Sequence, residues 1–189
     1  MSTLIVENLK GPTTGSNANT LTIPSGQTLS AAGHVIQVKQ TVVDGVFGTS
    51  IGNGFAEMTD FRTAITPSST SNKILAKATL HVGTSYFQIR GRLLRDTTPI
   101  GLGATRGIRR LCTYQNIIWP AGDAEYAMTT TGFEFLDSPA TTSSITYSID
   151  IGGYDSGHSV YLNRASQDNN LNAYNGQPMS TLTLMEIAG

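Results

Sequence analysis

Acidic side chains are the first residues of this chain that could do chemistry. Two carboxylates that flank a glycosidic bond can hydrolyse it, one as general acid and the other as base or nucleophile. The candidates, all in the second half of the chain, are Asp123, Glu125, Asp137, Asp150 and Asp155. Each lies at an expected turn or strand edge, where Asp serves local hydrogen bonding. A chain with 13 acidic residues produces such near-pairs by chance. We therefore expect no enzyme, and a glycan-cleaving spike is the weakest of three functional hypotheses.

Residues 168–172 begin like a calcium-binding loop, with the spacing D-x-[DN]-x-[DN]. The sixth position is Ala173, where the sharp turn needs Gly, and the twelfth is Met179, where calcium needs a bidentate Glu. The three histidines share no short ligand spacing and are His34, His81 and His158. We therefore expect no metal and no cofactor within one chain, while a metal on a three-fold axis stays open.

Nucleophiles are equally sparse. Residues 153–158 bring Asp155, Ser156 and His158 close together in sequence, but hydrolases assemble their triads from separated elements. Cys112 is the only cysteine, so an internal disulfide is excluded. Its strand-like surroundings are typical of a small core residue. These segments predict a polar loop and a packing residue.

Three tyrosines in or beside loops leave a binding role open. Tyr154, Tyr161 and Tyr174 combine an apolar ring with a polar tip, which suits contacts with carbohydrate or protein. The alternative is that the rings cap the ends of the domain. A host glycan is therefore one possible partner.

Charge and hydropathy exclude two classes of partner. Only 13% of residues are charged and the net charge is −1, so there is no basic field to bind nucleic acid. Two local arginine groups, residues 90–95 and 106–110, are interpreted as a solvated strand face or a salt-bridged rim. No run approaches the roughly 20 apolar residues that span a bilayer, and the N-terminus lacks the features of a signal peptide. We expect a protein made in a cytoplasm, with no membrane partner.

The elements that must position these residues are strands. Apolar residues alternate with polar ones over residues 74–82, 87–93 and 145–151, and Ser/Thr/Asn-rich turns separate the runs. Val38 and Val42 likewise alternate with Lys39 and Thr41. About eight to ten short strands predict an all-β protein, an antiparallel β-sandwich of the jelly-roll type.

The chain divides into two parts. Residues 1–33 form a short extended β segment with too few apolar residues to fold alone, and residues 34–189 form the jelly-roll domain. We expect the first part to attach the protein to a capsid or another partner. The apolar residues expected to make this attachment are Leu4, Ile5, Val6, Leu21, Ile23 and Leu29.

Two strands carry more apolar surface than a small sandwich needs. They are residues 145–151 and 182–187, and a closed three-fold arrangement would hide the surplus and protect the sheet edges. The side chains expected at this subunit interface are Ile145, Tyr147, Ile149, Ile151, Leu182 and Leu184.

Several segments carry a family resemblance. Residues 19–33 resemble the strand–turn–strand segment near the start of phage fibre and virion surface proteins. Residues 61–75, 135–142 and 182–187 together are similar to virion structural proteins of phages from aquatic bacteria, including cyanophages. Their C-terminal domains resemble trimeric jelly rolls of the tumour necrosis factor and complement type. The resemblance covers most of the chain but contains no catalytic signature.

The resemblance implies a homotrimer located on the virion of a bacteriophage. The leading hypothesis is a capsid decoration, or cement, protein that clamps the major capsid protein and stabilises the shell. The alternative is a receptor-binding fibre or knob that recognises a host surface glycan.

Overall fold

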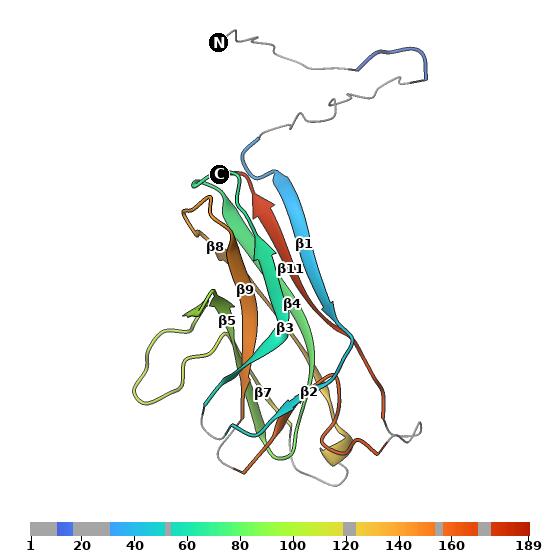
Figure 1. The fold of residues 1–189 in the computed structure, drawn as a ribbon, viewed down its shortest axis with the longest axis vertical. Coiled ribbons are helices and arrows are strands. Elements are labelled where there is room, and N and C mark those ends of the chain that lie inside the picture. The colour runs from blue at the N-terminus through green and yellow to red at the C-terminus, as the bar shows by residue number, and fades with distance from the viewer. Residues whose placement is uncertain (1–10, 17–30, 52–53, 119–123, 154–156, 170–174) are drawn as a thin grey trace. The chain divides into compact units, whose positions relative to one another are not determined.

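The computed structural model describes residues 11–16, 31–51, 54–118, 124–153, 157–169 and 175–189. Contacts along the chain separate two units, Met1–Ala31 and Ala32–Gly189. The second unit holds every strand of the described residues (Figure 1). A single 3₁₀ turn, Ala124–Tyr126, is the one helical element in this part of the chain.

The strands form two antiparallel sheets. Sheet A has six strands, in the order β1-β11-β4-β10-β2 with β8 on the free side of β4. Its strands are β1 (Val35–Val43), β2 (Phe47–Thr49), β4 (Lys73–Thr84), β8 (Thr129–Asp137), β10 (Val160–Leu162) and β11 (Ser180–Ile187). Sheet B has five strands, in the order β3-β9-β5-β6 with β7 also on β5. Its strands are β3 (Ala56–Ile65), β5 (Gln88–Arg95), β6 (Thr98–Ile100), β7 (Tyr114–Ile117) and β9 (Ile145–Gly152).

The strand order is that of a jelly roll. Setting aside the short strands β2, β6 and β10 leaves two four-stranded sheets, β1-β11-β4-β8 and β3-β9-β5-β7. Counted along the chain, these orders are 1-8-3-6 and 2-7-4-5, the arrangement made by two Greek keys. The predicted all-β jelly-roll sandwich is therefore confirmed.

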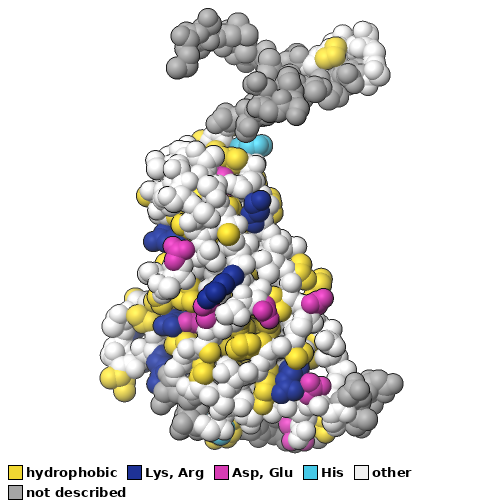
Figure 2. Space-filling view, viewed as in Figure 1, with side chains coloured by type: hydrophobic (Ala, Val, Ile, Leu, Met, Phe, Trp, Pro, Cys, Tyr) yellow, Lys and Arg dark blue, Asp and Glu magenta, His cyan; other side chains and the backbone are white. Residues whose placement is uncertain are grey.

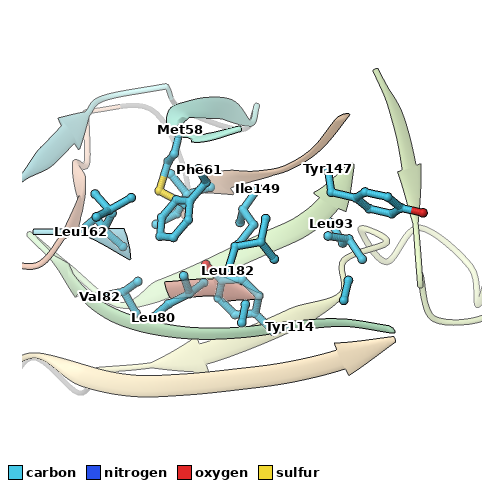
Figure 3. Close-up of a cluster of buried hydrophobic side chains, with 14 of the residues drawn as sticks. Met58, Phe61, Leu80, Val82, Leu93, Tyr114, Tyr147, Ile149, Leu162 and Leu182 are labelled. Carbon is cyan, nitrogen blue, oxygen red and sulfur yellow. The ribbon is translucent and has the colours of Figure 1, made fainter. Parts of the chain in front are cut away.

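The core lies between the two sheets. Figure 3 shows Phe61 and Ile149 from sheet B and Leu80 and Leu182 from sheet A, with side chains converging on one another. All four side chains are completely buried. Their strands alternate as the sequence predicts, because one face of each sheet must be apolar to pack on the other.

Strand β3 departs from regular pairing. Its register with β9 shifts between Met58 and Thr63, so several residues of β3 pass a single residue of β9. Such a bulge re-aims side chains locally. Both Met58 and Phe61 reach the core as a result.

Strand β1 turns Val38 and Val42 away from the core. Val38 and Val42 are exposed, while Thr41 Oγ1 on the opposite face accepts a hydrogen bond from Thr63 Oγ1 at 2.7 Å. At Thr41 the inward face of β1 meets a polar group of β3, whereas Val43 on the same face lies in the core. The apolar alternation of β1 therefore faces solvent in the single chain.

Candidate assembly surface

A row of apolar side chains crosses the outer face of sheet A. The register places Val38 of β1 opposite Met185 of β11, Met185 opposite Leu75 of β4, and Leu75 opposite Leu136 of β8. At the two ends, Val38 is 54% exposed and Leu136 is 47% exposed. Four adjacent strands thus present one continuous apolar row to solvent.

The neighbouring row on the same face is polar. Gln40, Thr183, Lys77 and Glu134 follow one another across the same four strands. Gln40 Nε2 donates to Thr183 Oγ1 at 2.8 Å. Lys77 lies opposite Glu134, and the ion pairs of the described residues include neither of them. The apolar row therefore has a polar border with charges of both signs.

The apolar row ends at an open sheet edge. β8 pairs with β4 over nine residues without a register shift. Within the described ranges, no further backbone hydrogen bond reaches the far edge of β8. Long, regular edges of this kind are templates for another strand. The row and the edge together form a surface suited to a partner chain.

The six side chains expected at a subunit interface lie elsewhere. Ile145, Tyr147, Ile149, Ile151, Leu182 and Leu184 are all in the core of the single chain. Packing of sheet A on sheet B accounts for the apolar character of these six side chains within one chain. The expected attachment residues, Leu4, Ile5, Val6, Leu21, Ile23 and Leu29, lie outside the described residues.

Sequence reasoning missed the members of the apolar row. The available signal was a break in alternation, where Leu75, Leu136 and Met185 each follow a buried or half-buried apolar neighbour. Such breaks show that both faces of a strand are apolar. Their alignment into one row depends on the register of four strands, which alternation does not contain.

Two of the candidate carboxylates are held by arginines. Asp150 accepts hydrogen bonds from Arg92 Nε at 3.0 Å, and Asp137 accepts from Arg95 Nη1 at 2.9 Å. Asp137 also accepts from the Tyr147 hydroxyl at 2.6 Å, and Figure 3 shows that oxygen pointing away from the core cluster. The sequence leaves two interpretations of the arginines in residues 90–95, a solvated strand face or a salt-bridged rim. The ion pairs of Arg92 and Arg95 confirm the salt-bridged rim for these two side chains.

Burial sets the electrostatics of this rim. Burial raises the pKa of Asp150, and the adjacent Arg92 guanidinium opposes that rise. Burial and the hydrogen bond to Asp137 raise the pKa of Tyr147. These groups are arranged as neutralised structural contacts, with their hydrogen-bonding positions occupied by protein side chains.

Glu186 is a buried carboxylate without an ion pair among the described residues. Its oxygens accept from Gln37 Nε2 and Asn72 Nδ2, both at 2.6 Å, and from the Ser68 amide and hydroxyl. Burial disfavours its charge, but these hydrogen bonds outweigh burial and lower its pKa. The cluster joins β1, β11 and the β3–β4 connection near the apolar row.

The remaining candidates are dispersed. His81 Nδ1 lies 2.9 Å from Thr130 Oγ1, and the ring of His158 stacks on Tyr86 at 4.3 Å. Within the described ranges, no three His, Cys, Asp or Glu side chains gather as metal ligands would. Burial raises the pKa of the Cys112 thiol, which is the opposite of nucleophile activation. Arg164 covers the ring of Tyr161.

Some of the carboxylates and tyrosines considered in the sequence, and part of the Asn-rich loop, fall outside the residues that the structure describes. Asp123, Asp155, Tyr154, Tyr174 and the end of the Asn-rich loop lie outside the described residues. Asp168, at the start of that loop, accepts from Arg164 Nη1 at 3.0 Å. Within the described part of the chain, no helix is long and apolar enough to cross a membrane.

No model of a known protein family matches this chain, and no curated protein matches its sequence. Similar solved structures include a VP2 mutant of infectious bursal disease virus in derived T=1 particles, with 12% identity and a TM-score of 0.39. That match covers 95% of this chain and 41% of VP2. The VP2 subviral particle of the same virus has 10% identity and a TM-score of 0.36, over 94% of this chain and 46% of VP2. This chain therefore spans less than half the length of the VP2 chains that it resembles.

Proposed function

We propose that this protein is a structural protein of a bacteriophage virion, a homotrimeric decoration protein that clamps the capsid and stabilises its shell. The family resemblance of residues 61–75, 135–142 and 182–187 supplies the virion setting. The observation that carries the proposal is the apolar row of Val38, Met185, Leu75 and Leu136. A protein that works by assembly needs such a surface and no reactive group.

A second copy of this chain is the occupant we propose for the apolar row. Its border of Lys77 and Glu134 offers both charge signs, so one copy can complement another without opposing like charges. The row begins on β1 and ends on β8, which are the edges of the four-stranded part of sheet A. Closing a ring of three copies would cover this face and protect an edge.

Charged substitutions in the row are expected to separate the subunits. The double variant Leu136→Lys and Met185→Lys should raise the dissociation constant of the oligomer by at least about tenfold, because it buries charge against apolar side chains. Light scattering coupled to size exclusion measures the mass, and the wild type is expected at three times 20.1 kDa. Thr79→Lys, on the same face but outside the row, is the control and should leave the mass unchanged. A monomeric wild type, or a double variant that remains trimeric, would contradict this assignment.

Attachment to shells is expected to require the N-terminal segment. We propose residues 1–33 as the anchor, but a truncation should begin at Ala32, because Gly33 N donates to Ala188 O at 2.8 Å. Tail-free capsid shells are prepared without this protein, and the wild-type protein is then added. It should bind to the shells and be visible on their surface by electron microscopy. Residues 32–189 should fold and assemble but bind at least about tenfold more weakly. Wild-type protein found only at the tail tip would sink the decoration role.

A receptor-binding knob is the second candidate function. It is favoured by one observation, the exposed ring of Tyr86 stacked on His158 beside the loops at one end of the sandwich. Paired rings of this kind can hold the apolar face of a sugar. Binding of the free protein to host cells, lost when host surface glycan is removed, distinguishes this role from decoration.

A further inference from the structure

The connection between β6 and β7 is a long loop with a fixed base. Thr113 Oγ1 donates to the carbonyl of Ile100 at 3.2 Å, and the amide of Leu93 donates to Thr113 Oγ1 at 2.9 Å. These bonds join the two ends of residues 101–112 to each other and to β5. Figure 1 shows the loop standing away from the two sheets. A projecting loop on a rigid base is a common way to present a binding residue.

The tip of this loop is a tight turn that presents one apolar side chain. The amide of Arg109 lies 3.4 Å from the carbonyl of Arg106, and Gly107 has φ +60, which favours glycine. Between them, Ile108 is fully exposed. Nothing in the described part of the chain covers it.

Arginines surround this apolar tip. Arg106, Arg109 and Arg110 are all exposed, and the ion pairs of the described residues involve other arginines. Burial is the largest cause that lowers the pKa of Arg90, and the positive charge of Arg110 lowers it further. The positive field therefore extends from the loop toward β5.

We infer that residues 101–112 form a docking loop that inserts Ile108 into an apolar pocket on an acidic surface of another virion protein. This inference rests on the proposed virion function and names the chemistry of the partner. The three arginines would steer and hold the acidic surface, while Ile108 supplies contact that charge alone does not.

A different protein fits this loop better than a second copy of the chain. Several acidic side chains take part in none of the ion pairs of the described residues, and they lie on separate elements. Among them are Asp60 in β3, Glu125 in the 3₁₀ turn and Glu134 in β8. No three of the described acidic side chains lie close enough together to hold a metal ion. A polyanion would engage the arginines but leave Ile108 in water. The tip therefore favours an acidic protein that also has an apolar pocket.

Binding to tail-free shells that lack this protein tests the loop. Ile108→Ser is expected to weaken wild-type binding by about tenfold or more, as the loss of one buried aliphatic side chain predicts. The double variant Arg106→Gln and Arg109→Gln should weaken it at least as much, and raising salt from about 0.15 to 0.5 M should reduce that difference. Lys39→Gln with Arg62→Gln removes the same charge from elsewhere and should bind as the wild type does. Thermal unfolding should be unchanged in every variant, because each substituted side chain is exposed.

The outcomes separate the loop from the proposed function. Wild-type binding that survives all loop substitutions overturns the docking loop and leaves the decoration role standing. A wild type that binds no shell overturns the decoration role together with this partner. Loop variants that lose binding to double-stranded DNA or heparin, with Ile108→Ser unchanged on shells, show a polyanion site and overturn the inference.

Discussion

Replacing Arg92 with Gln is expected to lower the free energy of unfolding by about 3 kcal/mol at pH 7, because it leaves the buried charge of Asp150 without its partner. Two guanidinium nitrogens of Arg92 bind this carboxylate, and the same guanidinium lies 4.0 Å above the ring of Phe55. The Asp150 side chain is almost completely buried, so water cannot replace the lost contacts. Urea denaturation followed by tryptophan fluorescence or circular dichroism measures the change.

The loss of unfolding free energy in Arg92→Gln should depend on pH in a defined direction. Burial raises the pKa of Asp150 above its ordinary value of 3.8, and removing Arg92 raises it further. A carboxyl with a raised pKa in the folded state favours folding below its ordinary pKa, and this contribution is lost as pH rises through the folded value. The variant should therefore be least stable, relative to the wild type, at neutral pH and should recover part of the difference near pH 4.

Arg62→Gln is the matched control. Arg62 pairs with Glu57 on the same sheet at 2.7 Å, but its side chain is exposed, and solvent-exposed ion pairs contribute little. The free energy of unfolding of Arg62→Gln should be close to that of the wild type at every pH. Equal losses in the two variants would show that burial of Asp150 does not set the effect, which would contradict the prediction.

Phe61→Ala is expected to lower the free energy of unfolding by about 3–5 kcal/mol, the usual cost of deleting a buried aromatic ring. Phe61 belongs to the irregular part of β3, yet its side chain is completely buried in the shared core (Figure 3). The bulge therefore contributes to packing, and its loss leaves a cavity between the sheets. Thermal or chemical unfolding of the isolated protein checks the magnitude.

Thr59→Ala tests whether the bulge itself is the sensitive feature. Thr59 lies in the same irregular segment but is exposed. We expect little change in stability, since no buried contact is removed. A loss similar to that of Phe61→Ala would mean that the backbone of the bulge, not the buried ring, carries the contribution.

Surface composition does not separate this protein from an ordinary domain. Figure 2 shows charged side chains scattered among hydrophobic and uncharged ones on one face of the molecule. Only the strand register reveals that Val38, Met185, Leu75 and Leu136 form one row. The alignment of these four side chains is therefore visible only once the strands are paired.

Much of the fold could be read from the chain, because alternation reports which face of a strand is buried. Residues 74–82 and 145–151 became β4 and β9, and the apolar side chains of residues 74–82 line one face of β4 as the alternation predicts. β1 did not follow the simple rule, since its neighbour across the core is polar. Val38 and Val42 face outward, and Thr41 meets Thr63.

The site could not be read in the same way. In the sequence, the arginines of residues 106–110 are interpreted as a solvated strand face or a salt-bridged rim, because the exposure of Ile108 depends on where the loop leaves the sandwich. The ion pairs of Arg92 and Arg95 join residues more than 40 positions apart, 92 with 150 and 95 with 137. Sequence spacing carries no information about such contacts.

The sequence by itself determined that this protein is an all-β sandwich with few charges, because strand periodicity and turn residues are local properties of the chain. The tertiary structure alone decided the jelly-roll order, the burial of Ile149 and Leu184 within one chain, and the apolar row on the outside. The physical reason is that strand order and register arise from long-range pairing. Only that pairing determines whether an apolar face is closed by the chain itself or left for a partner.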